Sequence, residues 1–409
     1  MYVTMEKKIN RFIKIFPWYQ GFIGDLLFYI AIDTLFLTMV KNFSPAQIVF
    51  LTSFSQITCI ALQFPILFII RNIGNTNASI VRALCMLLSA MLITFGKSFP
   101  VVLLGRVFHD VAGILSGATI VALENNLDLI GCRHKFVPIR TAANTVYSVI
   151  TMLISFVASL MFNLNHYLPM IGCITTCSIA FFLSFYMKDY SPYNKISNKV
   201  QKGERWKINY SKFIIMAIVV YAIYYPVVGT GQAEGKLFIQ QQLLLDFNVD
   251  QTSLILGAVV CISRIIRVFS NLWFAKIYSK HQEKTGVALP ILLCSALGFL
   301  LFGSFVPMTV VKIVIMAMGY IIILFARDPF KLYMQDVIFE NTPKEQHQTL
   351  ITVLEFGVKI GTAGMGLSFA AILTEYPMTV VMAIIFMIAL IEVYLSVMFY
   401  RIVMMKKVS

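Results

Sequence analysis

The chain has 409 residues, of which 59% are hydrophobic and only 13% are charged, and its mean hydropathy is +0.81. Soluble domains contain about 25% charged residues, so this composition excludes a soluble globular protein and predicts an all-α protein that crosses the membrane many times. The net charge of +14 would suggest nucleic-acid binding in a soluble protein. Basic cytoplasmic loops account for such a charge in a membrane protein, so we expect a lipid bilayer around the chain and no nucleic-acid partner.

Apolar runs of about 20 residues predict twelve membrane-spanning helices. The expected spans are 17–40, 45–70, 79–96, 99–123, 138–162, 167–187, 209–230, 252–277, 286–305, 309–338, 347–373 and 377–402. They divide into an N-terminal six-helix bundle (1–187), a basic cytoplasmic linker (188–208) and a C-terminal six-helix bundle (209–409).

Basic residues alternate between the two sides of this arrangement. The outer loops receive only a few lysines: Lys41, Lys97, Lys236 and Lys312. The other loop cations fall on the inner side, so we expect both termini and the linker to be cytoplasmic. The basic N-terminal stretch superficially resembles a signal peptide, but no cleavage site follows it, and we interpret it as part of a retained first helix. Richness in lysine and isoleucine points to a bacterial plasma membrane.

A short internal echo supports two similar halves. The tetrapeptide LENN at 123–126 recurs as FENT at 339–342, an offset of 216 residues, and each copy precedes a short cytoplasmic loop. Two halves in the same orientation are typical of one large class of transporters with parallel repeats.

Two carboxylates stand out in the first predicted span. Asp25, Tyr29 and Asp33 would fall along one side of a helix over 17–40. A charged side chain at bilayer depth costs about 2.5–3.5 kcal/mol, so such a residue faces a polar interior, pairs with a partner or stays protonated. For Asp25 the alternatives are proton or substrate binding and simple hydration at the cytoplasmic mouth.

The fourth predicted span supplies partners for these carboxylates. At about 1.5 Å per residue, Arg106 lies level with Asp33, while Asp110 lies nearer to Asp25. We expect an ion pair between Arg106 and Asp33, which is either a permanent brace or part of a proton-coupling group made of Asp25, Asp33, Arg106 and Asp110. His109 is either a packing residue or a proton relay.

Polar stripes on the second and fifth spans predict a water-filled cavity, although serine and threonine also cement helix packing. Aromatic residues on the seventh span would suit an amphipathic or cationic molecule, or would form an interfacial belt. The predicted substrate-binding set is Tyr29, Gln56, His109, Asn144, Tyr221, Tyr224, Tyr225, Arg264 and Arg267.

The second half contains further intramembrane charges. Arg264 and Arg267 share a face and are the best candidates for an anion site, but intramembrane cations and anions nearly balance, so an anionic substrate is not required. Arg327, Asp328 and Pro329 are expected to interrupt the tenth span. The predicted cytoplasmic gate, for which static bracing is the alternative, consists of Arg327, Asp328, Glu355 and Lys359.

These residues resemble the major facilitator superfamily over the whole chain. Arg106 with Gly113 resembles the family's fourth-helix arginine motif, whose arginine is implicated in proton coupling, and Asp25 and Asp33 with that arginine are similar to the arrangement in proton-driven multidrug antiporters. The loop at 71–76 keeps the family's glycine, Gly74, but lacks its aspartate. The fifth span has no Gly-Pro antiporter motif.

The sequence thus predicts a proton-coupled secondary transporter that works by alternating access and exports a small amphipathic compound by antiport. Uptake by proton symport is the alternative, and a receptor or scaffold on the same fold is an alternative of another class. An enzyme is not expected, because the five histidines are scattered and no nucleophile cluster is evident. Seven cysteines without a CxxC motif indicate no metal site. We expect a monomer that has no cofactor and is driven by the proton gradient.

Overall fold

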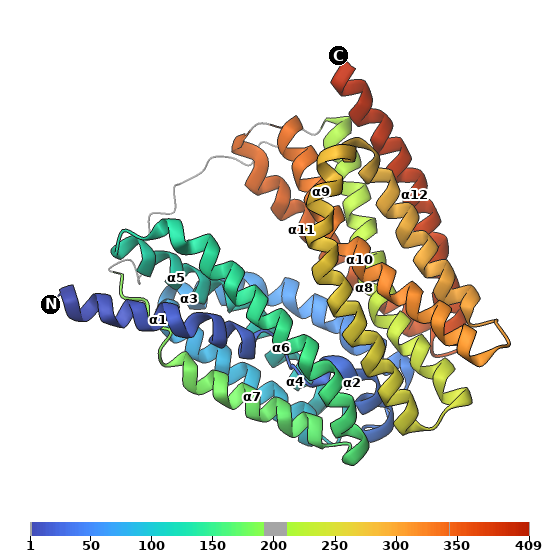
Figure 1. Ribbon diagram of the computed structural model, residues 1–409, viewed down its shortest axis with the longest axis horizontal. Helices are drawn as coiled ribbons and strands as arrows, with labels where there is room; N and C mark the ends of the chain where they lie inside the picture. Colours follow the sequence, from blue (N-terminus) through green and yellow to red (C-terminus); the bar gives the residue numbers. More distant parts are fainter. Residues whose placement is uncertain (1, 192–210, 343, 409) are drawn as a thin grey trace. The chain divides into compact units, whose positions relative to one another are not determined.

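The computed structural model describes residues 2–191, 211–342 and 344–408, and every regular element within these ranges is a helix (Figure 1). The first elements are α1 (Tyr2–Ile23), α2 (Tyr29–Leu35), a π-helix η1 (Phe36–Val40), α3 (Pro45–Phe95), α4 (Phe99–Ile114), α5 (Ser116–Leu129), a 3-10 helix η2 (Arg133–Lys135), α6 (Phe136–Leu164) and α7 (Leu168–Ser184). The later elements are α8 (Lys212–Asp246), α9 (Val249–Gly303), α10 (Thr309–Asn341), α11 (Lys344–Ile372) and α12 (Met378–Val408). The predicted all-α fold is confirmed.

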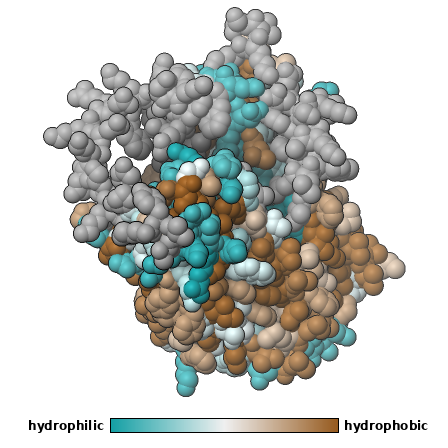
Figure 2. Space-filling model, turned by 60° about the vertical axis from the view of Figure 1, so that its left-hand side comes forward, coloured by the Kyte–Doolittle hydropathy of each residue, from teal (hydrophilic) through white to brown (hydrophobic). Residues whose placement is uncertain are grey.

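Within the described ranges, nine helical segments are long and apolar enough to cross a bilayer, and Tyr29–Val40 and Leu168–Ser184 are shorter apolar helices. Together with α11, each of these segments overlaps one of the twelve predicted spans, so a count of twelve is compatible with the structure. Large apolar side chains such as Phe64, Leu164 and Phe182 are well exposed, and Figure 2 shows apolar residues over much of the visible surface. Lipid is the solvent that such a surface fits.

The chain separates into two compact units. The first contains Met1–Lys41 and Thr58–Glu204, and the second contains Asn42–Ile57 and Arg205–Ser409. The start of α3 therefore groups with the second unit, whereas the sequence assigns it to the N-terminal bundle. Most of the predicted linker lies outside the described residues, so its boundaries stay a prediction.

The first predicted span is broken at its acidic residue. α1 ends at Ile23 and α2 begins at Tyr29, so the prediction of one continuous helix over 17–40 is wrong. In the gap, the Asp25 carboxylate accepts a hydrogen bond from the Leu26 N–H at 2.8 Å. Such local bonds offer the backbone an alternative to helical ones. Only Tyr29 and Asp33 lie one turn apart on a shared helix.

Two corrections apply to the second unit. α8 continues to Asp246, so the predicted outer loop after residue 230 is helical, and Lys236 is buried in it. The glycines of this stretch permit close packing, because Gly231 and Gly235 face Leu297 and Leu300 of α9.

The predicted interruption of α10 at Pro329 is also wrong, because α10 runs through this residue. Proline leaves the carbonyl four residues earlier without its helical donor. That carbonyl, on Phe325, instead accepts a hydrogen bond from the Ser270 hydroxyl at 3.0 Å.

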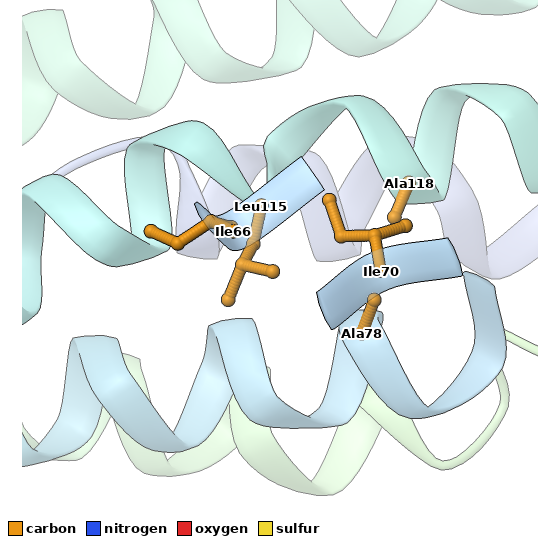
Figure 3. Close-up of a cluster of buried hydrophobic side chains, with 5 residues drawn as sticks. All are labelled: Ile66, Ile70, Ala78, Leu115 and Ala118. Carbon is orange, nitrogen blue, oxygen red and sulfur yellow. The ribbon is translucent and has the colours of Figure 1, made fainter. Parts of the chain in front are cut away.

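A small apolar core joins α3 to α4 and α5 in the first unit (Figure 3). Gly74 has φ 77° and ψ 164°, a conformation open mainly to glycine, and it divides α3 into two helical segments. Ile66 and Ile70 precede this glycine and Ala78 follows it. Leu115, at the junction of α4 and α5, packs into the same cluster with Ala118.

Asp189, just after α7, links the kink of α3 to helix α5 in the first unit. Its carboxylate accepts hydrogen bonds from the side-chain amides of Asn75 and Asn125, both at 2.8 Å, and from the Ser191 N–H at 3.0 Å. The loop at 71–76 lacks the aspartate of the superfamily it resembles, and here an aspartate from a distant part of the sequence contacts it.

Replacing Asp189 with Asn should lower the free energy of unfolding by about 2 kcal/mol, since hydrogen bonds to a charged group are lost and an amide faces two other amides. Asp128→Asn, which alters a carboxylate on the exposed ion pair with Arg133, is the matched control and should cost less than about 1 kcal/mol. Unfolding in detergent measures both variants. Equal stability of the two would contradict the role given to Asp189.

Candidate functional site

The break between α1 and α2 places the Asp25 carboxylate beside α4. The Tyr29 N–H donates to the Leu26 carbonyl at 2.9 Å, which starts the new helix immediately after the break. Gly24 packs against the ring of Tyr147 on α6, where a Cβ atom would overlap the ring. Non-helical backbone at membrane depth is tolerated where protein or a water-filled cavity covers it.

His109 stands between two carboxylates. Its Nε2 lies 3.0 Å from Asp25 Oδ1, and its Nδ1 lies 3.7 Å from Asp110 Oδ1. Arg106 Nε lies 3.8 Å from the same Asp110 oxygen, one helical turn away. Arg106, His109 and Asp110 share one face of α4 by their spacing, and His109 contacts Asp25 from that face. The structure therefore brings together four of the predicted site residues.

The exposure of the two carboxylates differs strongly. The Asp25 side chain is 36% exposed, that of His109 is 18% exposed and that of Asp110 is 5% exposed. A proton that reaches Asp25 from water has an imidazole within hydrogen-bond distance, and a second carboxylate lies on the far side of that imidazole. Imidazole is the side chain best suited to accept on one nitrogen and release from the other.

The remaining predicted residues of α2 lie nearby. Tyr29, the first residue of α2, is buried. One Asp33 oxygen accepts a hydrogen bond from the Thr34 N–H at 2.7 Å. The expected ion pair between Asp33 and Arg106 stays a prediction.

Two predicted polar residues fall in different units. Gln56 belongs to the second unit and is half-buried. Asn144 lies on α6 in the first unit, where it lines a cavity of about 260 Å³ that also reaches Gly24, next to Asp25. Arg82 and Arg140 line the same cavity.

The second unit holds a tight ion pair between α9 and α10. Arg267 donates from Nε to Asp328 Oδ2 at 2.7 Å and from Nη2 to Asp328 Oδ1 at 3.1 Å. This two-point bond gives Arg267 an anionic partner within the chain, and the expectation that Arg267 serves an anion site stays a prediction. Arg264, one turn away, has a buried Nε that makes no hydrogen bond within the described part of the chain.

The predicted gate residues form hydrogen bonds with partners that the sequence does not reveal. Arg327 donates to the side-chain oxygen of Gln232 at 3.0 Å. Glu355 accepts from Lys331 at 2.7 Å, although the sequence suggests Lys359, one turn away, as its partner. A gating role for Arg327, Asp328, Glu355 and Lys359 stays a prediction.

The tyrosines of α8 are used in packing. Tyr221 and Tyr224 are buried, and the Tyr224 ring stacks on Phe330 with 3.7 Å between ring centroids. The hydroxyls of Tyr224 and Tyr225 donate to backbone carbonyls of α10 at 3.0 and 2.8 Å. The side chain of Tyr224 therefore holds α8 against α10, and a substrate-binding role for Tyr221, Tyr224 and Tyr225 stays a prediction.

Among the described residues, no group of three or more His, Cys, Asp or Glu side chains is close enough to hold a metal ion.

No protein-family model matches the chain, and no curated protein matches it in sequence. Several solved structures nevertheless align over nearly its whole length. A mutant of the nucleoside transporter NupG aligns with a TM-score of 0.76 at 12% identity, covering 96% of this chain and 99% of that one. The chain has the fold of the major facilitator superfamily.

Other structures with this fold align similarly. A bacterial homologue of the iron transporter ferroportin, in its inward-facing state, gives a TM-score of 0.71 at 11% identity, covering 98% of this chain and 99% of that chain. A bacterial homologue of the human lysosomal transporter Spinster gives 0.65 at 11% identity, covering 95% and 96% of the two chains. The predicted resemblance to the major facilitator fold is therefore confirmed, and the chain is a multi-pass membrane protein.

Sequence reasoning missed three residues that lie close to the site. Gln20 and Tyr147 were not singled out, and Arg82 was counted only as an inner-side loop cation. A clear signal for Arg82 is absent from the sequence, because its position three residues into the span 79–96 fits both a loop charge and a buried one. Only the cavity in which it lies separates the two.

Proposed function

We propose that this chain is a secondary active transporter that moves a small organic molecule by alternating access and is driven by a proton gradient. The observation that carries the proposal is the row of Asp25, His109 and Asp110 beside a broken first span. A transporter fold alone leaves the energy source open, whereas three titratable groups in a row supply a place for a proton.

The row runs from a partly exposed carboxylate to a buried one. A proton that binds to it changes the local charge by one, next to the cation of Arg106. Alternating access then exposes the same groups to water on the other side. Coupling follows if the loaded and unloaded forms of the row favour different conformations, because a ligand shifts an equilibrium only by its differential affinity for the two states.

We further propose export by antiport as the direction of transport, with an amphipathic compound as cargo. Uptake by symport uses the same groups with the opposite sign of proton movement. The names of the proteins with similar structures give no common cargo, since one is a nucleoside transporter, one is a homologue of an iron transporter and one is a homologue of a lysosomal transporter. The chemical class of the cargo therefore has to be inferred from the residues of this chain.

The test uses purified protein in proteoliposomes with an imposed pH gradient. A panel of cationic, zwitterionic, neutral and anionic compounds is added, and proton movement is followed with a trapped pH dye. We expect at least one compound to trigger proton movement in the wild type and in Glu124→Gln, a control on an exposed ion pair. Asp25→Asn should abolish the movement.

The sign of the proton movement separates antiport from symport. If Asp25→Asn retains full proton coupling, the Asp25–His109–Asp110 row is structural bracing and coupling through it is refuted. If no compound moves in any assay, the scaffold alternative replaces transport.

A further inference from the structure

The cavity of about 260 Å³ in the first unit is lined by two arginines from different helices, Arg82 on α3 and Arg140 on α6. We propose that this cavity binds a small organic oxyanion, a carboxylate or a phosphate ester, through Arg82 and Arg140. This names the charge class of the cargo and so rests on the proposed transport function.

The first line of support is the state of the hydrogen-bond donors. Arg82 is only 5% exposed, and its Nε makes no hydrogen bond to any residue that the structure describes. The amide nitrogen of Gln20, which also lines the cavity, is likewise buried and without an acceptor in the described ranges. The Gln20 oxygen accepts from Arg82 Nη1 at 3.4 Å, which fixes the amide nitrogen as a donor. Two donors therefore lack acceptors beside one cavity.

The second line of support is charge. Arg82 contacts neutral groups, namely Gln20 and Tyr19, whose ring centroid lies 5.9 Å from the guanidinium carbon. Arg140 lies at the same distance from the ring of Phe136. Among described residues, no Asp or Glu carboxylate lies within ion-pair distance of either guanidinium. Buried charges are normally paired, so an anion from outside the chain is the missing partner.

The shape and lining of the cavity narrow the ligand. Ligand pockets for drug-sized molecules measure about 300–1,000 Å³, so 260 Å³ suits a smaller molecule. The planar fork of a guanidinium matches the two oxygens of a carboxylate or phosphate. Phe16, Ile120 and Tyr147 add an apolar and aromatic wall, which suits an organic body attached to the anionic group.

Three other occupants compete with this ligand. Ordered water would satisfy the donors but would leave the two cations unneutralised. An anionic lipid headgroup has the same chemistry as a free phosphate ester, and basic pockets between membrane helices do bind such headgroups. Inorganic phosphate would fill the polar end and leave the aromatic wall without a partner. The experiment below separates these cases.

Binding is measured on the purified full chain in neutral detergent, at constant ionic strength, from the concentration dependence of the thermal unfolding midpoint. The probes are benzoate, phenyl phosphate, inorganic phosphate and the neutral analogue benzyl alcohol. We expect benzoate or phenyl phosphate to raise the midpoint with saturation. Arg82→Gln and Arg140→Gln should each weaken that binding about tenfold or more, since each removes a charge-assisted hydrogen bond.

Arg133→Gln is the matched control, because Arg133 is an exposed arginine of the same unit that pairs with Glu124. It should leave the binding constant unchanged. If Arg82→Gln does not fold, Arg82→Lys and Arg140→Gln carry the test, and both should weaken binding while the control does not.

Several results would overturn the proposal. These are saturation by benzyl alcohol equal to that by benzoate, no saturable oxyanion effect in the wild type, or equal weakening by Arg133→Gln. Saturation by inorganic phosphate alone would also overturn it, as would binding seen only with phosphatidylglycerol and not with free oxyanions. Oxyanion binding without any transport would refute the proposed function and keep the site, whereas transport without oxyanion binding would refute the site alone.

Discussion

Replacing His109 with glutamine is expected to slow proton-driven transport about a hundredfold, the scale of a lost acid–base group. The glutamine amide can donate to Asp25 from the place of the imidazole Nε2, so the 3.0 Å hydrogen bond has a substitute. It cannot take up a proton and release it from the other side of the ring. Structural bracing would therefore survive the substitution, whereas proton relay would not.

The comparison that isolates this effect is substrate exchange at equal pH on both sides of a proteoliposome membrane. Exchange needs binding and reorientation but no net proton transfer, so the His109→Gln rate should stay within a few-fold of the wild type. His166→Gln is the matched control, because His166 stacks on Phe162 in the same unit, with 4.6 Å between centroids, and has no place in the site. Parallel loss of exchange and proton-driven transport in His109→Gln would contradict a relay.

The ion pair between Arg267 and Asp328 should show the largest single effect on stability. Removing either charge, by Arg267→Gln or Asp328→Asn, is expected to lower the free energy of unfolding by about 3 kcal/mol, because the remaining charge is left without its two-point partner inside a membrane span. The side chains are only 31% and 27% exposed, so water replaces the lost partner poorly.

A double-mutant cycle measures the pair itself. Arg267→Gln combined with Asp328→Asn removes both charges and should be less destabilising than the sum of the same two single substitutions. Glu124→Gln, on a surface pair whose arginine is 70% exposed, sets the scale for an ion pair in water and should cost less than about 1 kcal/mol. Additive single and double effects would mean that the two charges do not stabilise one another.

The spans and the helical fold could be predicted because bilayer thickness and hydropathy impose them locally. The predicted starts of the spans at 45 and 309 match the first residues of α3 and α10. The break at Asp25 could not be predicted from hydropathy. In the structure the Leu26 N–H donates to the Asp25 carboxylate and not to a helical carbonyl.

Proline and glycine were misread for a related reason. Pro329 breaks a helix in isolation. Here the Ser270 hydroxyl, from another helix, donates to the carbonyl that the proline leaves without its helical donor. The predicted span ended at residue 230, but α8 continues through Gly231 and Gly235, which allow close packing against α9. This packing cannot be known until the position of α9 is known. Tertiary contacts decide both cases.

Only part of the candidate site could be predicted from the sequence. The depth argument placed Asp110 near Asp25, and the structure does bring the two to opposite sides of His109. Arg82 escaped notice because a basic residue near the end of a span is explained equally well by membrane topology. Side-chain partners such as Arg267 with Asp328 need the helices to be packed before they can be seen.

The central claim, that transport is coupled to protons, is tested most directly by a null-point measurement. Proteoliposomes are loaded with the transported compound, and a series of pH gradients is imposed. At each pH gradient, the outside concentration of the compound is varied until its net flux stops. The account predicts that this concentration moves with the imposed pH gradient in the wild type and ceases to move in Asp25→Asn. A null point that stays at equal concentrations on both sides, whatever the pH gradient, would contradict it.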